Sequence, residues 1–291
     1  MRDASYIIIS PVRNEAQYLP LTIASVAAQT VRPRCWILVD DGSTDGTGRI
    51  VDQAAAQYGW IRSIHRPNRG FRQAGGGVVE AFDDGYKLVR DEPWRFLVKL
   101  DGDLSFSADY FEKCFRKFET EARLGIGGGL VCSAADGALE GESKRDPQFH
   151  VRGATKIYRN ACWNQIGGLI RAPGWDTLDE VKANMLGWAT RTFADIQLVH
   201  HRPSGHAYGQ WSNWIKNGRA NYVVGYHPLF MLAKCGRRML EKPYVLEGFG
   251  LWVGFVSGYL KRIPQIEDRE VMRFFRRQQM NRLLGRKSLW G

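Results

Sequence analysis

The sequence predicts an α/β fold, in which a mostly parallel sheet is flanked by helices and followed by a basic, helical C-terminal extension. Short apolar, β-branched runs alternate with longer amphipathic stretches as far as residue 132. Polar clusters directly follow several of these runs, and the chain becomes aromatic and basic after Pro203. These observations divide the chain into an α/β domain, residues 1–201, and a helical region, residues 202–291.

The expected strands and helices follow from hydrophobic periodicity and segment length. Strands are predicted at Tyr6–Ile9, Trp36–Val39, Trp60–Ile64, Phe96–Leu100 and Ile126–Val131. Helices are predicted at Tyr18–Gln29, Gly46–Tyr58, Ala74–Val89 and Ala108–Ala122. Strands that alternate with helices of this length form βαβ units, and such units build a parallel sheet.

The pattern is less regular between residue 133 and the end of the α/β domain. Ser133–Gln148 is rich in Gly, Ser and charged residues, which predicts a loop. The remaining expected elements are a strand at His150–Tyr158, a short helix around Cys162–Ile166, a helix within Gly174–Gly187, and a strand ending at His200 and His201.

An apolar segment, Val245–Leu260, dominates the helical region. Glu247 and four glycines interrupt it, and it is too short to span a bilayer comfortably. We expect a helix in the membrane interface, with Trp252 and Tyr259 at headgroup level. Residues 269–287 predict a second helix, amphipathic and basic. A packed helical subdomain with a solvated basic face is the alternative, and the sequence leaves both open.

The net charge of +11 lies entirely in the helical region, because residues 202–291 hold 16 Lys and Arg against 5 Asp and Glu. Such a basic region predicts an anionic membrane surface as partner. We expect no nucleic acid, because no nucleic-acid-binding signature accompanies the charge. The N-terminus lacks the pattern of a signal peptide, and the five cysteines form no CxxC pair. The expected location is therefore cytoplasmic, peripheral to the inner face of the plasma membrane.

Three polar clusters follow predicted strands: Pro11–Glu15, Asp40–Ser43 and Asp101-Gly102-Asp103. Ligands of parallel sheets bind at the carboxyl ends of the strands, so we expect these clusters to meet at one edge. Two carboxylates around a glycine at a strand end can converge on Mg²⁺ or Mn²⁺, leaving positions open for phosphate oxygens. The sequence therefore predicts a divalent-metal site at this edge.

Together, in this order and spacing, the clusters resemble the nucleotide-binding half of glycosyltransferase family 2, which has the GT-A fold. The resemblance covers roughly residues 5–201. It implies a nucleotide-binding half, residues 1–103, and an acceptor half, residues 104–201. It also implies an inverting, metal-dependent enzyme that uses a nucleoside-diphosphate sugar as donor.

The resemblance assigns roles to individual residues of the donor site. The nucleoside pocket would comprise Pro11, Val12, Arg13 and Glu15, and Asp41 would contact the base. Asp103 would be the main metal ligand, with Asp101 against the ribose or the metal, Gly102 between them, and Lys99 just before the site. Arg69 and Arg72 would lie near the diphosphate. One of the two adjacent histidines, His200 and His201, would be a third metal ligand, and we choose His201.

The catalytic base is expected at the head of the helix within Gly174–Gly187. The family supplies it from a Glu-Asp pair at the head of a helix, and counting back from Gly187 places Asp176 at the aspartate position. Trp175 stands where the family has glutamate, so Asp179 and Glu180 remain rivals one turn along the helix. A carboxylate here would take the acceptor hydroxyl's proton.

The implied function is sugar transfer to a lipid-linked or polysaccharide acceptor at the cytoplasmic membrane face. A nucleotidyltransferase also uses paired aspartates and metal, but it would need a glycine- and arginine-rich loop after the first strand. The third possibility is a non-catalytic module that binds nucleotide-sugars or membranes. The sequence leaves the donor base, the sugar and the acceptor open.

Overall fold

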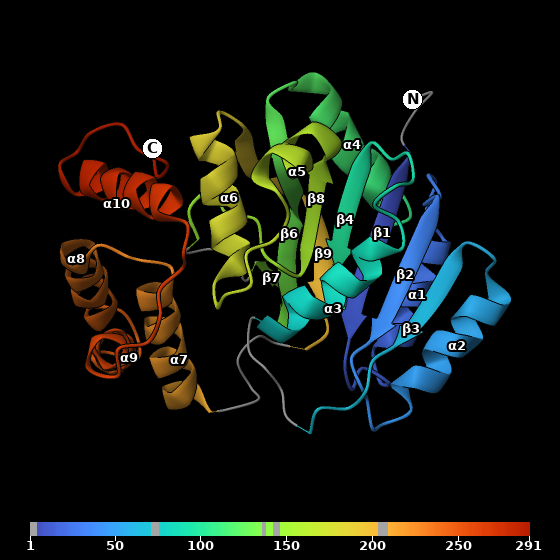
Figure 1. Ribbon diagram of the computed structural model, residues 1–291, viewed down its shortest axis with the longest axis horizontal. Coiled ribbons are helices and arrows are strands. Elements are labelled where there is room, and N and C mark those ends of the chain that lie inside the picture. The colour runs from blue at the N-terminus through green and yellow to red at the C-terminus, as the bar shows by residue number, and fades with distance from the viewer. Residues whose placement is uncertain (1–4, 71–75, 136–137, 142–145, 203–208) are drawn as a thin grey trace.

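A twisted sheet forms the centre of the molecule, and a separate group of helices follows it in the chain (Figure 1). The computed structural model describes residues 5–70, 76–135, 138–141, 146–202 and 209–291. The strands are β1 (Tyr6–Val12), β2 (Cys35–Asp40), β3 (Ile61–His65), β4 (Phe96–Leu100), β5 (Leu104–Phe106), β6 (Leu124–Ala135), β7 (Ala138–Gly141), β8 (Thr155–Arg159) and β9 (Ala189–His200).

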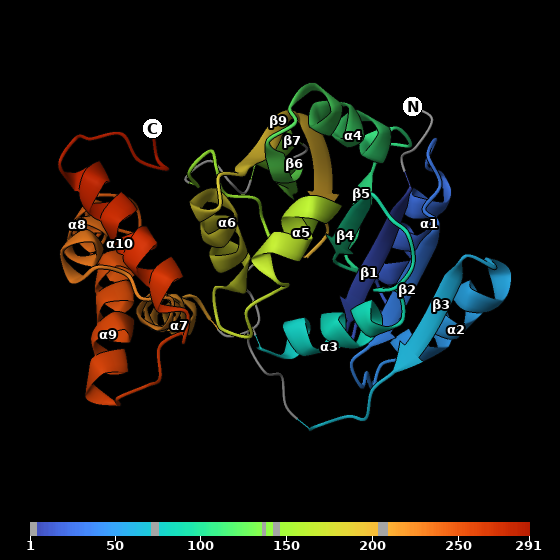
Figure 2. The ribbon, with the colours of Figure 1, turned by 45° about the horizontal axis from the view of Figure 1, so that its top comes forward.

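Helices cover both faces of this sheet, as Figure 2 also shows. In the α/β domain they are α1 (Leu19–Ala27), α2 (Thr47–Gln57), α3 (Gly76–Lys87), α4 (Tyr110–Thr120), α5 (Asn160–Ile166) and α6 (Trp175–Met185). The helical region contains α7 (Gln210–Val223), α8 (Pro228–Met239), α9 (Leu246–Leu260) and α10 (Arg269–Leu283).

The α/β class is confirmed, but the sheet is mixed rather than mostly parallel. Among the described strands, four pairs are parallel and four are antiparallel. The strand order is β3-β2-β1-β4-β8-β6-β9-β5, with β7 paired to β6. The strands β1, β2, β3, β4, β6 and β9 run in one direction, and the other described strands run against them. The carboxyl ends of the parallel strands therefore meet at one edge, which lies at the bottom in Figure 1.

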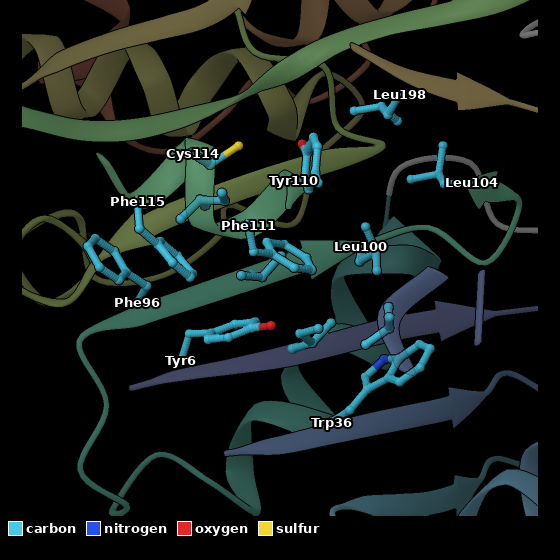
Figure 3. Packing of buried hydrophobic residues seen from close by; sticks show 14 of the residues in the cluster. Tyr6, Trp36, Phe96, Leu100, Leu104, Tyr110, Phe111, Cys114, Phe115 and Leu198 are labelled. Carbon is cyan, nitrogen blue, oxygen red and sulfur yellow. The ribbon is translucent and has the colours of Figure 1, made fainter. Parts of the chain in front are cut away.

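Two apolar layers hold the sheet between its helices. Side chains alternate along each strand, so Tyr6 and Ile8 of β1 face one layer while Ile7 and Ile9 face the other. In the first layer, drawn in Figure 3, Phe96 of β4 stacks on Phe115 of α4 with ring centroids 4.7 Å apart. The aromatic packing of this layer fixes the strands whose ends carry the polar clusters.

Two predicted segments differ from the structure. The loop expected at Ser133–Gln148 is wrong in part, because β6 extends to Ala135 and pairs with β7 as antiparallel strands. Asp136-Gly137, a dipeptide typical of hairpin turns, separates the two strands in sequence. The strand expected at His150–Tyr158 is confined to Thr155–Arg159. The Val151 amide instead donates to the Glu180 carboxylate at 2.7 Å, which takes this segment out of the ladder.

The helical region packs around an apolar core to which all four of its helices contribute, together with Leu178 and Val181 of α6. Helices α7 and α9 approach closely at Gly218 and Gly254, where an added Cβ would come within 2.0 Å of a carbonyl oxygen of the other helix. Leu251 and Phe255 of α9 and Phe275 of α10 are buried in this core. The apolar faces expected to lie in a membrane are thus largely occupied by packing. No helix among the described residues is long and apolar enough to cross a bilayer.

Candidate functional site

The loops after β1 and β2 are joined by hydrogen bonds. The Asn14 amide donates to Ser43 Oγ at 3.0 Å, and the Thr44 amide donates to Asn14 Oδ1 at 2.8 Å. The Glu15 amide donates to Thr47 Oγ1 at 2.8 Å. The two predicted nucleoside-binding clusters therefore form one structure. Val12, at the end of β1, is 2% exposed and forms part of its floor.

The adjacent aspartates Asp40 and Asp41 have different surroundings. Asp40 accepts from the Ser43 amide at 2.9 Å and contacts His65 Nδ1 at 3.2 Å, so it holds the turn. The Asp41 carboxylate is bound by Arg66 and Arg69, two arginines that follow β3.

Arg13 completes this side of the site. Its guanidinium donates to the Asp41 carbonyl at 2.7 Å and to Asn68 Oδ1 at 2.8 Å. Arg13, Arg66 and Arg69 place three guanidinium groups around Asp41. Glu80 and Asp84 also pair with the last two of these arginines, so carboxylates balance their charge. Guanidinium groups that exchange a carboxylate partner are suited to phosphate oxygens. Arg72, expected near the diphosphate, lies outside the described residues.

The Asp101-Gly102-Asp103 turn begins where β4 ends. Gly102 packs so tightly that an added Cβ would lie 2.8 Å from Val12 Cγ1, which explains the small residue between the aspartates. The Lys99 ammonium binds the Asp101 carboxylate and donates to the Gly153 carbonyl at 2.5 Å. Desolvation raises the pKa of Asp101, although the charge of Lys99 opposes that rise.

Asp103 is the better anion of the pair. It is 7% exposed, and His200 Nε2 lies 3.3 Å from its Oδ2. Burial alone would raise its pKa, but the hydrogen bond and charge of His200, with the charges of Arg202 and Lys99, lower it overall. Asp103 is thus held as a carboxylate.

The two histidines at the end of β9 point to different partners. His200 faces Asp103, whereas His201 Nε2 lies 2.9 Å from Ser105 Oγ and its ring stacks on Tyr18 with centroids 5.9 Å apart. The geometry therefore favours His200 over His201 as the imidazole beside the metal-binding candidate.

A divalent cation fits the donor chemistry at this turn. Among the described side chains, no group of three or more His, Cys, Asp or Glu converges as a complete metal cage. Mg²⁺ is usually held by one or two carboxylates together with substrate phosphates, and Asp103 with Asp101 supplies such a pair. These residues suit a cation that arrives with, or is completed by, a diphosphate.

Helix α6 brings its first turn to the same edge. Trp175 is 7% exposed, and two ammonium groups lie near the centroid of its ring, Lys99 Nζ at 5.4 Å and Lys156 Nζ at 5.6 Å. Asp176 is half-buried, and its Oδ2 is 3.3 Å from where a Cβ on Gly153 would be. Gly153 is also the residue whose carbonyl holds Lys99, so Asp176 lies beside the Asp101 side of the turn.

Behind Trp175 lies a sealed ionic cluster, which we define as His150, Lys156, Tyr158, Asp179 and Glu180. Lys156 Nζ lies 2.8 Å from Asp179 and 2.7 Å from Glu180, and it also donates to the Asp176 carbonyl. Tyr158 donates to Asp179 at 2.5 Å, and His150 contacts Glu180 at 2.8 Å. Burial raises the pKa of Asp179 to about 7. Asp179 and Glu180 are at most 1% exposed, so they are less accessible than the half-buried Asp176.

Comparison with known proteins agrees with this arrangement. The family model described as glycosyl transferase family 2 matches residues 7–170, more than half of the chain. The chain belongs to glycosyl transferase family 2. The predicted family is thereby confirmed, and membership supports the predicted transferase class.

Several curated glycosyltransferases are similar over the same part of the chain. GlyG of Streptococcus pneumoniae is 28% identical over 45% of this chain and 40% of its own length. The polyprenol monophosphomannose synthase of Mycolicibacterium smegmatis is 31% identical over 43% of this chain and 45% of its own length. The match thus spans less than half of either relative.

Solved structures of the same fold cover more of the chain. The mannosyltransferase PcManGT of Pyrobaculum calidifontis, in complex with GDP-Man and Mn²⁺, has a TM-score of 0.57 at 13% identity. That alignment covers 98% of this chain and 76% of PcManGT. Staphylococcus aureus TarS 1–349 with UDP-GlcNAc has a TM-score of 0.56 at 14% identity, over 92% and 78% of the two chains. These likenesses confirm the predicted GT-A fold.

Sequence reasoning missed several polar residues of this family 2 site. Arg66 and Lys156 each lie in or next to a strand, where a single cation gives no motif. Arg202 directly follows the histidine pair and binds Glu15 across the site. The one available signal was a lysine within each of two apolar strands, Lys99 and Lys156, whose positions pair in the β4–β8 ladder.

Proposed function

We propose that this chain is an inverting glycosyltransferase that uses a nucleoside-diphosphate sugar and Mg²⁺ or Mn²⁺. The observation that carries the proposal is the grouping of Asp101, Asp103 and Asp176 around Lys99 and Gly153. Asp101 and Asp103 are suited to a cation. Asp176 is a half-buried carboxylate on a separate element, helix α6. A nucleotidyltransferase would not need the second carboxylate in this place.

The donor would lie along the carboxyl ends of β1, β2 and β4. Pro11, Val12, Arg13 and Glu15 would line the nucleoside pocket, and Asp41 would accept hydrogen bonds from the base once its arginines engage phosphate. Arg66 and Arg69 then serve the diphosphate, because planar guanidinium groups bind phosphate oxygens through paired hydrogen bonds. Glu15 and Arg202 would close the pocket from the β9 side.

Asp103 is proposed as the main metal ligand, with Asp101 and His200 beside it in place of the expected His201. When bound, the cation supplies positive charge that stabilises the departing diphosphate. Lys99 holds the Asp101 carboxylate in place and adds a second cation to the group.

Asp176 is proposed as the catalytic base. The acceptor hydroxyl oxygen attacks the anomeric carbon, the bond from that carbon to the diphosphate oxygen breaks, and the nucleoside diphosphate leaves with the electron pair. Asp176 takes the hydroxyl proton as the new glycosidic bond forms. Asp179, the rival, would instead stabilise α6 through Lys156.

The proposed acceptor is a lipid-linked sugar, a lipid phosphate or a polysaccharide, handled at the cytoplasmic face of a membrane. The support is that two relatives are named polyprenol monophosphomannose synthase and undecaprenyl-phosphate mannosyltransferase, together with the basic helical region. Residues 1–201 would form the catalytic domain, with 1–103 as the nucleotide-binding half and 104–201 as the acceptor half. Residues 202–291 would be the membrane-associating part.

Donor binding tests the proposal directly. Melting temperature is measured with UDP-, GDP- and dTDP-sugars, each with and without Mn²⁺, because a ligand that binds only the folded state stabilises it. One donor class should raise the melting temperature only with Mn²⁺, and Asp103→Ala should abolish that rise. If no nucleotide-sugar stabilises the protein, or if donor hydrolysis survives Asp103→Ala unchanged, the proposal is wrong.

A further inference from the structure

Helix α8 has apolar residues on two opposite faces. Met231 and Cys235 point into the helical core, at 0% and 1% exposure. On the other side, residues at positions i, i+3, i+4, i+7 and i+11 share one face. We define the outer face of α8 as these five exposed residues: Leu229, Leu232, Ala233, Gly236 and Leu240.

The three leucines of the outer face are more than half exposed. Leu229 and Leu232 are each 56% exposed, and Leu240 is 79% exposed. A Cβ added to Gly236 would meet nothing within 4 Å. In both ribbon views α8 lies on the side of the helical region away from the sheet (Figures 1 and 2). The described part of the α/β domain therefore lies on the other side of the helical region from this helix.

The apolar surface continues into the corner between α8 and α9. Tyr244, Val245 and Leu246 are consecutive and 60%, 56% and 52% exposed, and Phe249 follows one turn later at 48%. Val245 begins α9 with a φ of 65°. That left-handed conformation is unfavourable for a β-branched residue, and such strain is typical of functional loops.

Cations border this surface. The Arg237 side chain is 81% exposed, and Lys242 is also exposed. Glu241 and Glu247 lie next to them and are engaged by Arg237 and Arg238. The balance remains positive, and the whole helical region carries +11.

We propose that the outer face of α8 and the α8–α9 corner dock on an anionic lipid surface. Large exposed apolar patches on soluble domains mark interaction sites. This one is a convex helix face with a protruding turn, edged by basic residues, and a bilayer of anionic lipid matches both features. The inference rests on the membrane location in the proposed function. It assigns docking to the outer face of α8 and the exposed first turn of α9, rather than to the faces of α9 and α10 that are buried in the core.

Vesicle flotation of the full chain tests the proposal. The vesicles are phosphatidylcholine, with or without phosphatidylglycerol. The triple variant Leu232→Ser, Leu240→Ser, Leu246→Ser should lower partitioning onto anionic vesicles at least about tenfold, since each loses apolar area that would enter the interface. The matched control is Leu21→Ser, Leu88→Ser, Leu186→Ser, whose leucines are 44–50% exposed on the α/β domain. It should float like the unaltered chain.

A charge variant distinguishes the contribution of the bordering cations to membrane binding from that of the apolar residues. Arg237→Gln with Lys242→Gln should weaken binding to phosphatidylglycerol vesicles and leave the melting temperature unchanged. Donor hydrolysis in solution should be unaffected in every variant, because none of these residues is in the donor site.

Each other outcome overturns the inference in a recognisable way. If the leucine triple variant floats like the control, another surface binds the membrane, and the membrane part of the proposed function survives. If the unaltered chain ignores all vesicles, both fail, while donor hydrolysis still tests the transferase. If the triple variant instead converts a dimer into a monomer without changing flotation, the face is an interface between copies.

Discussion

Lys99 on β4 and Lys156 on β8 are cross-strand neighbours that both contact the Trp175 ring, but they bind different carboxylates. Lys99 binds Asp101, whose side chain is 31% exposed at the mouth of the site. Lys156 binds Asp179 and Glu180, which are sealed from solvent. The open pair is suited to exchange partners with a ligand, whereas the sealed pairs fix the helix that carries Asp176.

The two groups of charged residues also differ in their access to water. A buried ion pair is costly to form and still more costly to break, so the sealed cluster is expected to control stability and the geometry of α6. The open group, which we define as Lys99, Asp101, Asp103 and Asp176, would offer carboxylates that a cation and an acceptor can reach. Substitutions in the two groups should therefore affect different measurements.

The largest expected effect is on turnover. Asp176→Asn removes the proposed base and should lower kcat about 10²- to 10⁴-fold, since that is the usual contribution of general acid–base catalysis. The melting temperature should stay near that of the unaltered chain, because Asp176 is half-buried and outside the sealed cluster. Steady-state kinetics and thermal unfolding check both points.

Asp179→Asn is the matched control for that substitution. It should lower the melting temperature and leave the base in place. The opposite pattern, with Asp179→Asn inactive but stable and Asp176→Asn active, would make Asp179 the base.

The next largest effect concerns the two lysines. Lys156→Met leaves two buried carboxylates without their cation, so it should reduce the free energy of unfolding by about 3–5 kcal/mol. Lys99→Met should cost less stability and raise the Mn²⁺ concentration needed for activity, because Asp101 loses its anchor. Urea unfolding and Mn²⁺ titration of donor hydrolysis measure the two effects. Equal losses of stability would contradict the distinction between open and sealed groups.

Histidine 150 makes the stability of the sealed cluster depend on pH. Burial opposes its charge, but Glu180 outweighs burial and raises the pKa of His150 to about 9. A histidine with a raised pKa stabilises the fold fully below its unfolded value of about 6.5, and the contribution disappears as pH rises through about 9.

Urea unfolding across this pH range, with His150→Gln beside the unaltered chain, measures the contribution. The difference in unfolding free energy should be up to about 3 kcal/mol at pH 6 and should shrink toward zero by pH 10. A difference that does not vary with pH would mean that His150 is neutral in the fold.

Much of the fold was predictable from local signals. Apolar runs that alternate with amphipathic stretches predicted β1 to β4 and the helices between them. Strands β1, β2 and β4 are almost continuously buried, which matches their apolar runs. The hairpin of β6 and β7 was missed, since its small and polar residues look like a loop. The shortened β8 was missed because Glu180, distant in sequence, takes the Val151 amide.

The site was predictable where residues are adjacent in sequence, as in Asp101-Gly102-Asp103. It was not predictable where the partners come from separate elements. Lys156 and Asp179 meet only because β8 packs beneath α6, and no spacing rule connects them. The choice between His200 and His201 is similar: alternation predicts opposite faces, but only the Tyr18 ring and Ser105 determine which face His201 takes.

The smallest expected effect distinguishes these two histidines. His200→Gln removes the imidazole 3.3 Å from Asp103 and should raise the Mn²⁺ concentration for half-maximal donor hydrolysis about tenfold, the scale typical of residues around a metal ligand. His201→Gln should leave that concentration nearly unchanged, because the His201 ring hydrogen-bonds with Ser105 and stacks on Tyr18 instead of facing Asp103. Metal titration of both variants against the unaltered chain measures the difference. A larger shift for His201→Gln would place the cation on the Ser105 side of the β9 end. His201, rather than His200, would then be the histidine beside the metal.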